Sequence, residues 1–146
     1  MESPKLRECG ECNLCCKLER IKETNKPGGA WCINCKIGTG CRIYDDRPET
    51  CRQFNCLWKR LLDMPEEIRP DKVHMYVVGN LEDYCVKVVV DPDYPNAWKE
   101  GIGAEIIERI ALTTHMLVMV GRQINFVPSI QNEMPEKLNI EWILPC

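Results

Sequence analysis

Four cysteines fall within eight positions near the start of the chain, where residues 9–16 read CGECNLCC. Five more follow before residue 57, so nine of the 11 cysteines lie in the first 56 residues. Thiolate sulfur is a preferred ligand of zinc and the usual ligand of iron–sulfur clusters. The crowding therefore predicts a metal–thiolate site built from Cys9, Cys12, Cys15, Cys16, Cys32, Cys35, Cys41, Cys51 and Cys56.

A disulfide framework is the other use of so many cysteines, and several features argue against it. The total is odd, and the neighbours Cys15 and Cys16 pair with each other only in a strained ring. The first residues, MESPKLREC, lack the apolar core of a signal peptide, so we expect a cytoplasmic protein with reduced thiols. Cys85, among valines, is expected to be a small core residue, and Cys146 to be incidental.

Composition places the chain among ordinary single-domain proteins. With 146 residues, 45% of them apolar, and a net charge of −3, it has enough for a core and no global attraction to nucleic acid or membranes. No stretch approaches the run of about 18 apolar residues that a membrane span needs. Residues 1–60 carry 12 Lys and Arg against 8 Asp and Glu. This local excess would offset the negative charge of a metal–thiolate centre, although an ordinary solvated face is the simpler reading.

Two partitions of the thiols make chemical sense. In the first, Cys9 and Cys12 pair with Cys32 and Cys35 as the two knuckles of a zinc ribbon. In the second, Cys9, Cys12 and Cys15 supply three ligands of a 4Fe–4S cluster, and Cys51 or Cys56 supplies the fourth. Nine thiols exceed one four-ligand site. The sequence is therefore compatible with two mononuclear sites or with one polynuclear site that has bridging thiolates.

Residues 1–62 are predicted to form a cysteine-rich module with one short helix. Turn-forming glycines and prolines dominate up to about residue 47, and metal binding would supply the folding energy that this part lacks. The helix is predicted over residues 47–62, with capping-box spacing between Asp46 and Glu49. On an unbroken helix, Cys51 and Cys56 would point about 140° apart. Either these two cysteines serve different centres or the helix ends near Asn55.

Residues 63–146 show conventional periodicity, and we expect them to form one compact domain with the module. The order ββαββ predicts an α+β fold in which an antiparallel sheet is covered by one long helix. The helix is expected to open at Pro95-Asn96, with a stripe of apolar residues four apart beginning at Trp98. Strands are predicted at 73–78, 84–90, 116–120 and 123–127, with a last one at 138–144.

Four segments in order carry a resemblance to a known family. They are CGECNLCC at 9–16, the single Cys32, GCRIYDDRP at 40–48 and CRQFNC at 51–56. The chain resembles here the bacterial YkgJ-like proteins, a zinc- or iron-chelating domain of the CxxCxxCC type. The resemblance covers about residues 9–60 and implies metal chelation by eight of the nine thiols, since Cys35 lies outside the pattern. Some flagellin lysine methylases look similar in carrying such a cluster, which there implies iron–sulfur, but this chain is much shorter and the activity is not carried over.

The leading hypothesis is a metal-binding protein that holds an iron–sulfur cluster or zinc, with the metal at least structural. The spacing of Cys9, Cys12 and Cys15 tilts the choice slightly toward iron–sulfur. The alternatives are an iron–sulfur redox or group-transfer protein and a zinc-stabilised adaptor that binds a protein partner. Arg47 and Arg52 are candidates to donate hydrogen bonds to the metal-bound sulfurs. No residue is assigned a catalytic role.

Overall fold

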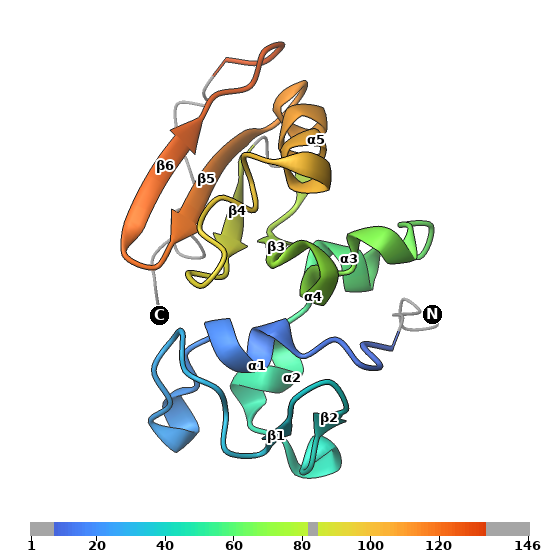
Figure 1. Cartoon of the computed structure of the whole chain (residues 1–146), viewed down its shortest axis with the longest axis vertical. Helices are drawn as coiled ribbons and strands as arrows, with labels where there is room; N and C mark the ends of the chain where they lie inside the picture. Colours follow the sequence, from blue (N-terminus) through green and yellow to red (C-terminus); the bar gives the residue numbers. More distant parts are fainter. Residues whose placement is uncertain (1–7, 82–84, 134–146) are drawn as a thin grey trace.

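The computed structural model describes residues 8–81 and 85–133 of the chain. It is a mixed α and β structure in which a cysteine-rich part and a sheet are stacked along the long axis (Figure 1). The cysteine-rich part consists of short elements joined by turns. In chain order these are α1 (Leu14–Leu18), η1 (Lys22–Thr24), β1 (Cys35–Lys36), β2 (Gly40–Cys41), η2 (Tyr44–Asp46), α2 (Glu49–Gln53) and α3 (Leu57–Arg60).

The helix predicted over residues 47–62 is broken into α2 and α3. Phe54 is extended, with φ −74° and ψ 119°, and Cys56 is extended as the N-cap of α3. The prediction of one helix was therefore wrong. The break lies between Cys51 and Cys56, which an unbroken helix would point about 140° apart. The expected capping box is also absent, since Pro48 is the N-cap of α2 and no side chain caps it.

The larger sheet is mixed, not antiparallel as predicted. Its strand order is β3-β4-β5-β6, and the pairs β3–β4 and β5–β6 are antiparallel as predicted. The central pair, β4–β5, is parallel, with Val88 opposite Val118. Because α5 carries the chain from one end of β4 back to the other, β5 runs in the same direction as β4. These elements are β3 (Met75–Val78), β4 (Cys85–Val90), α5 (Gly101–Ala111), β5 (His115–Val120) and β6 (Gln123–Val127), preceded by η3 (Glu66–Ile68) and α4 (Pro70–Val73).

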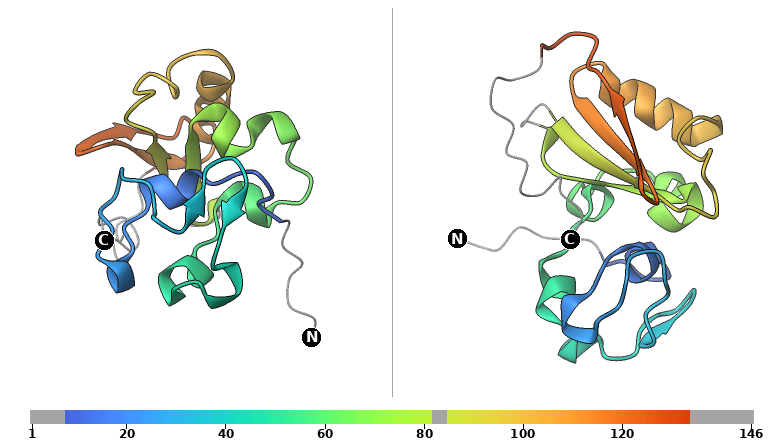
Figure 2. Two further views of the ribbon diagram at one scale, coloured as in Figure 1. Left: turned by 60° about the horizontal axis from the view of Figure 1, so that its bottom comes forward. Right: turned by 90° about the vertical axis from the view of Figure 1, so that its left-hand side faces the viewer.

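The helix α5 covers one face of the sheet (Figure 2), and the main core lies between them. Val86, Val88, Met116 and Val118 alternate along the two central strands and are fully buried, and Ile107 packs on them from α5. The helix begins at Gly101, later than the predicted start near Pro95. The predicted last strand at 138–144 and Cys146 lie outside the described residues.

The preceding segment packs so closely on α5 that one glycine is required there. A Cβ on Gly103 would lie 1.7 Å from the carbonyl oxygen of Ala97. Any other side chain at this position would therefore displace the backbone of the loop that leads into the helix.

The cysteine-rich part packs on the sheet through the face opposite α5. Leu14 and Leu18 of α1, with Trp58 of α3, form a buried cluster around Tyr76 of β3. The ring of Phe54 meets Tyr76 edge to face at 5.2 Å. In the described residues, no helix combines the length and apolar character that crossing a membrane requires.

A buried ion pair ties α1 to the end of β4. The ammonium of Lys17 lies 2.8 and 2.9 Å from the two carboxylate oxygens of Asp91, and it also contacts Asp93. The side chains of Lys17 and Asp91 are 8% and 4% exposed, whereas that of Asp93 is 72% exposed. The Lys17–Asp91 pair is therefore the desolvated one, and it fixes how α1 sits on the sheet.

We predict that Lys17→Met destabilises the protein by about 3–5 kcal/mol, because it leaves the Asp91 carboxylate buried without its partner. Urea unfolding followed by far-UV circular dichroism measures the change. The control is Lys72→Met, since the Lys72 ammonium is 4.0 Å from Glu66 and both side chains are largely exposed. That substitution should cost less than about 1 kcal/mol. Equal stability of the two variants would contradict the role given to Lys17.

Candidate metal centre

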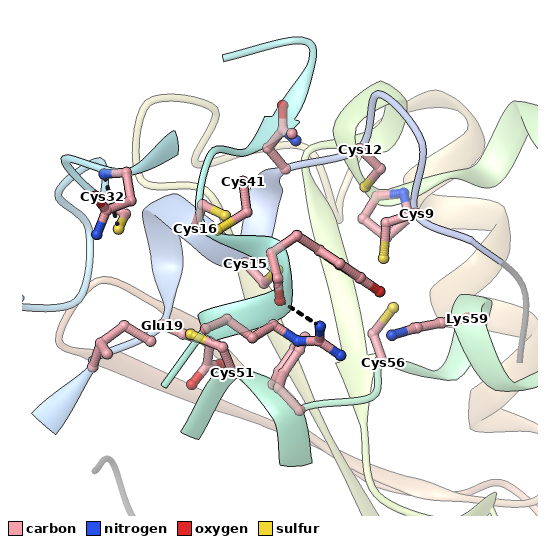
Figure 3. Close-up of a pocket in the computed structure, with 18 of the residues that line it drawn as sticks. Cys9, Cys12, Cys15, Cys16, Glu19, Cys32, Cys41, Cys51, Cys56 and Lys59 are labelled. Atoms are coloured by element: carbon pink, nitrogen blue, oxygen red, sulfur yellow. Dashed lines mark hydrogen bonds between the residues drawn. The ribbon is translucent and has the colours of Figure 1, made fainter. Parts of the chain in front are cut away.

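Eight of the nine N-terminal cysteines line one cavity in the cysteine-rich part. Its volume is about 450 Å³, roughly fifteen times the share of one liquid water molecule. Figure 3 shows thiols reaching into it from several sides. The lining cysteines are Cys9, Cys12, Cys15, Cys16, Cys32, Cys41, Cys51 and Cys56.

The thiols reach the cavity from loops, helices and a strand. Cys9 and Cys12 belong to the turn before α1, closed by the Cys12 amide donating to the Cys9 carbonyl at 3.0 Å, with Gly10 at φ +57°. Cys15 and Cys16 follow on α1 itself. Cys32 is joined to α1 by its amide, which donates to the Cys16 carbonyl at 3.0 Å. Cys41 ends β2, Cys51 lies on α2, and Cys56 is the N-cap of α3.

Cys35 stands apart from the cavity. It lies on β1, opposite Cys41 of β2, and is not among the lining residues. Its thiol donates a hydrogen bond to the Cys16 sulfur, which supports Cys16 from outside the cavity. Cys85 is buried in β4 with 1% of its surface exposed, as predicted.

Burial keeps most of these thiols neutral. It raises the pKa of Cys12 to about 12 and that of Cys51 to about 11, and it also raises the pKa values of Cys9 and Cys56. Each charged form would be poorly solvated, and neighbouring thiols add repulsion. Several thiolates can therefore share this cavity only with a cation among them.

Cys16 differs from these thiols because its pKa is lowered. Its sulfur accepts a hydrogen bond from the Cys15 thiol and another from Cys35, and these lower its pKa to about 6 despite partial burial. Lys26 lowers the pKa of Cys16 further. The same hydrogen bond raises the pKa of Cys15. In metal-free protein at pH 7, Cys16 is thus a thiolate held by its neighbours.

Two lysines place positive charge near the thiols. Lys26 is buried, and its ammonium donates to the carbonyl oxygens of Lys17 at 3.1 Å and Pro27 at 2.9 Å, as well as to that of Glu19. Lys59 lines the cavity, lies next to Cys9 and Cys56 in Figure 3, and lowers the pKa of Cys9 against the effect of burial. Both would offset the charge of bound thiolates.

The two candidate arginines hold the backbone around the cavity. Arg47 lines it, donates to the Tyr44 carbonyl at 2.7 Å and stacks over the Tyr44 ring at 4.0 Å. Arg52 donates to the carbonyls of Arg47 and Asp45 at 2.9 and 2.7 Å. These hydrogen bonds go to carbonyl oxygens, and the expected donation to metal-bound sulfurs stays a prediction.

The cavity wall also contains residues that sequence analysis missed. Tyr76 of β3, 2% exposed, donates its hydroxyl to the carboxylate of Glu19, and both residues line the cavity. Lys26 and Lys59 were likewise not singled out. Their spacing from the cysteines follows no ligand pattern, and Lys26 is held by carbonyl oxygens of its own segment.

In the described part of the chain, all ten cysteines are free thiols. Within the same residues, no group of three or more His, Cys, Asp or Glu side chains is arranged as a ready-made site for one metal ion. Comparison with protein-family models, with curated proteins and with solved structures finds no match.

We predict that Cys16 is the most reactive thiol of the reduced, metal-free protein at pH 7. Thiolate is the form that reacts with iodoacetamide, so its alkylation rate should rise with pH to a plateau with a midpoint near 6. Cys12 and Cys51, with pKa values of about 12 and 11, should react far more slowly at pH 7. Peptide mass spectrometry gives each rate. A Cys16 midpoint of 8 or above would contradict this.

Proposed function

We propose that the protein binds a thiolate-preferring metal in the cysteine-lined cavity, with the metal at least structural. The observation that carries this proposal is the meeting of eight thiols, from separate turns, helices and a strand, around one cavity of about 450 Å³. Buried thiols that raise each other's pKa gain most when a cation replaces their protons. The donor set, sulfur alone with nearby lysines, suits zinc or iron–sulfur and not the hard cations that prefer oxygen.

Of the two metals, we favour an iron–sulfur cluster. Thiolates around a multinuclear cluster bind different iron atoms and stand farther apart than the ligands of a single zinc ion. A cavity many times the volume of one ion suits the wider spacing, and the spacing Cys9-x₂-Cys12-x₂-Cys15 is that of cluster ligands. The YkgJ-like resemblance and the structural role of the metal in residues 1–62 belong to this proposal. A reducing, cytoplasmic setting would keep such thiols available.

An iron–sulfur redox or group-transfer activity is the second candidate. It is favoured by the partial exposure of the cavity thiols, since Cys9, Cys32, Cys41 and Cys51 are neither fully buried nor fully exposed. A solvent-reachable cluster can exchange electrons or bind a substrate, whereas a purely structural site is usually closed. The zinc-stabilised adaptor with a protein partner stays a prediction.

The decisive measurement is the iron, sulfide and zinc content after anaerobic isolation from cells grown with iron. We expect iron and sulfide with a brown, bleachable absorbance near 400 nm. Zinc alone would overturn the iron–sulfur proposal and leave a zinc protein. Aerobic isolation is not informative, because oxygen-damaged clusters leave thiolates that zinc fills readily.

We predict that Cys12→Ser lowers the metal content and the melting temperature, because a four-ligand site reduced to three loses much of its binding energy. The matched control is Cys85→Ala, which removes a buried thiol outside the cavity. It should keep the full metal content and cost about 1–2 kcal/mol through lost packing. Elemental analysis and thermal unfolding test both variants. Equal metal content in wild type and Cys12→Ser would contradict the role given to Cys12.

We also predict that metal affinity falls as the pH is lowered. The pKa values of Cys9, Cys12, Cys15, Cys51 and Cys56 are all raised, so these five thiols are protonated at pH 7 and each must lose its proton to bind. Metal titration in buffers of different ionisation enthalpy should report release of one proton for each of these thiols that binds the metal. Uptake or release of no protons would mean that these thiols are not ligands.

A further inference from the structure

The cavity thiols separate into two sets on opposite sides. Figure 3 shows Cys9, Cys12 and Cys56 on one side with Lys59, and we call these the Lys59-side thiols. On the other side lie the four that we call the β2-side thiols, with Cys15 between the two sets. The β2-side thiols are Cys16, Cys32, Cys41 and Cys51.

Interactions among the Lys59-side thiols agree with this division. Cys9 and Cys12 share one closed turn, with 3.0 Å between the Cys12 nitrogen and the Cys9 oxygen. Cys9 raises the pKa of Cys12 and also that of Cys56. Cys56 is the N-cap of α3, after the break that follows α2, and it lies on this side with Cys9 and Lys59.

The β2-side thiols are linked in the same way. Burial raises the pKa of Cys51, and the nearby Cys16, Cys32 and Cys41 raise it as well. Cys32 is tied by its backbone amide to the carbonyl of Cys16. Cys16 also raises the pKa of Cys9 across the cavity.

The adjacent pair on α1 forms the divide between the sets. Successive helical residues point about 100° apart, so Cys15 and Cys16 leave the helix in different directions, although the Cys15 thiol still reaches the Cys16 sulfur. Cys16 faces Cys35 and the β2-side thiols. Cys15 is the more deeply buried, and its pKa is raised by Cys9 and Cys12 as well as by Cys16. Its spacing from Cys12 repeats that from Cys9 to Cys12, so Cys15 completes the Lys59-side set as a fourth ligand.

We infer that the cavity holds two four-thiolate centres, one formed by Cys9, Cys12, Cys15 and Cys56 and the other by Cys16, Cys32, Cys41 and Cys51. This inference rests on the proposed function. Each centre takes a thiolate-preferring metal, either zinc or an iron–sulfur cluster. Cys35 is not a ligand, and its thiol holds Cys16 in place from outside the cavity.

The first test uses wild-type protein, reduced and freed of metal. One equivalent of Zn²⁺ is added anaerobically, the exposed thiols are alkylated with N-ethylmaleimide, and intact chains are sequenced by mass spectrometry. We expect protection in blocks of four, with Cys9, Cys12, Cys15 and Cys56 protected together or the β2-side thiols protected together. Chains with a protected block of four that mixes Cys9 with Cys41 would overturn the division, whereas chains with all eight thiols protected must carry two Zn²⁺. A parallel loading with ferrous iron and sulfide distinguishes the two metals.

The second test counts metal in variants. Wild type should bind two Zn²⁺ per chain, and Cys56→Ser and Cys41→Ser should each bind one. The matched control Cys35→Ser should keep both. Loss of both ions in either single variant would show one shared centre with bridging thiolates and overturn the division while metal binding stands. If the variants unfold by circular dichroism, the wild-type protection pattern decides.

Failure of the proposed function would look different from failure of the division. Wild-type protein that binds neither Zn²⁺ nor iron with sulfide would overturn metal binding itself. Wild-type protein that binds only one equivalent, with all eight cavity thiols protected, would overturn the two-centre arrangement alone.

Discussion

The cysteine-rich part depends on one electrostatic constraint: several thiols buried around one cavity cannot all ionise, because their charges would be poorly solvated and would repel each other. Burial, with smaller contributions from Asp71 and Cys9, raises the pKa of Cys12 to about 12. Cys16 has a lowered pKa because its sulfur is held by hydrogen bonds from two other thiols. A divalent ion or cluster would satisfy the constraint for several thiolates at once, because it neutralises them together.

The same part has little core of its own and relies on the sheet. Leu14, Leu18 and Trp58 are buried only because they meet Tyr76, on the face that α5 leaves uncovered. The Lys17 ammonium between Asp91 and Asp93 adds a directional contact to this apolar one. The apolar contact and the buried ion pair together fix the orientation of α1, and with it that of Cys15 and Cys16, relative to the sheet.

Much of this could be predicted from local sequence, and the rest depended on long-range packing. Strand-like runs bounded by turn residues predicted β3, β4, β5 and β6. The parallel pairing of β4 and β5 was missed because no local pattern tells whether a helix between strands returns the chain to the same end of the sheet. The cysteines of the cavity were identified by residue type and spacing, whereas the Glu19–Tyr76 contact joins segments 57 residues apart and leaves no local signal. The unbroken helix failed at Phe54, whose ring is drawn toward Tyr76 by tertiary packing.

Three consecutive residues of α1 connect the two halves of the molecule. Cys15 points to the middle of the cavity, Cys16 to the β2-side thiols, and Lys17 to Asp91 at the end of β4. A rotation of α1 that improved the position of one sulfur would therefore displace the other and pull Lys17 away from Asp91. Because the buried ion pair resists that rotation, the geometry of the thiols on both sides is coupled to the integrity of the sheet. The cavity and the sheet are therefore linked through α1, although cysteines line the one and apolar strands form the other.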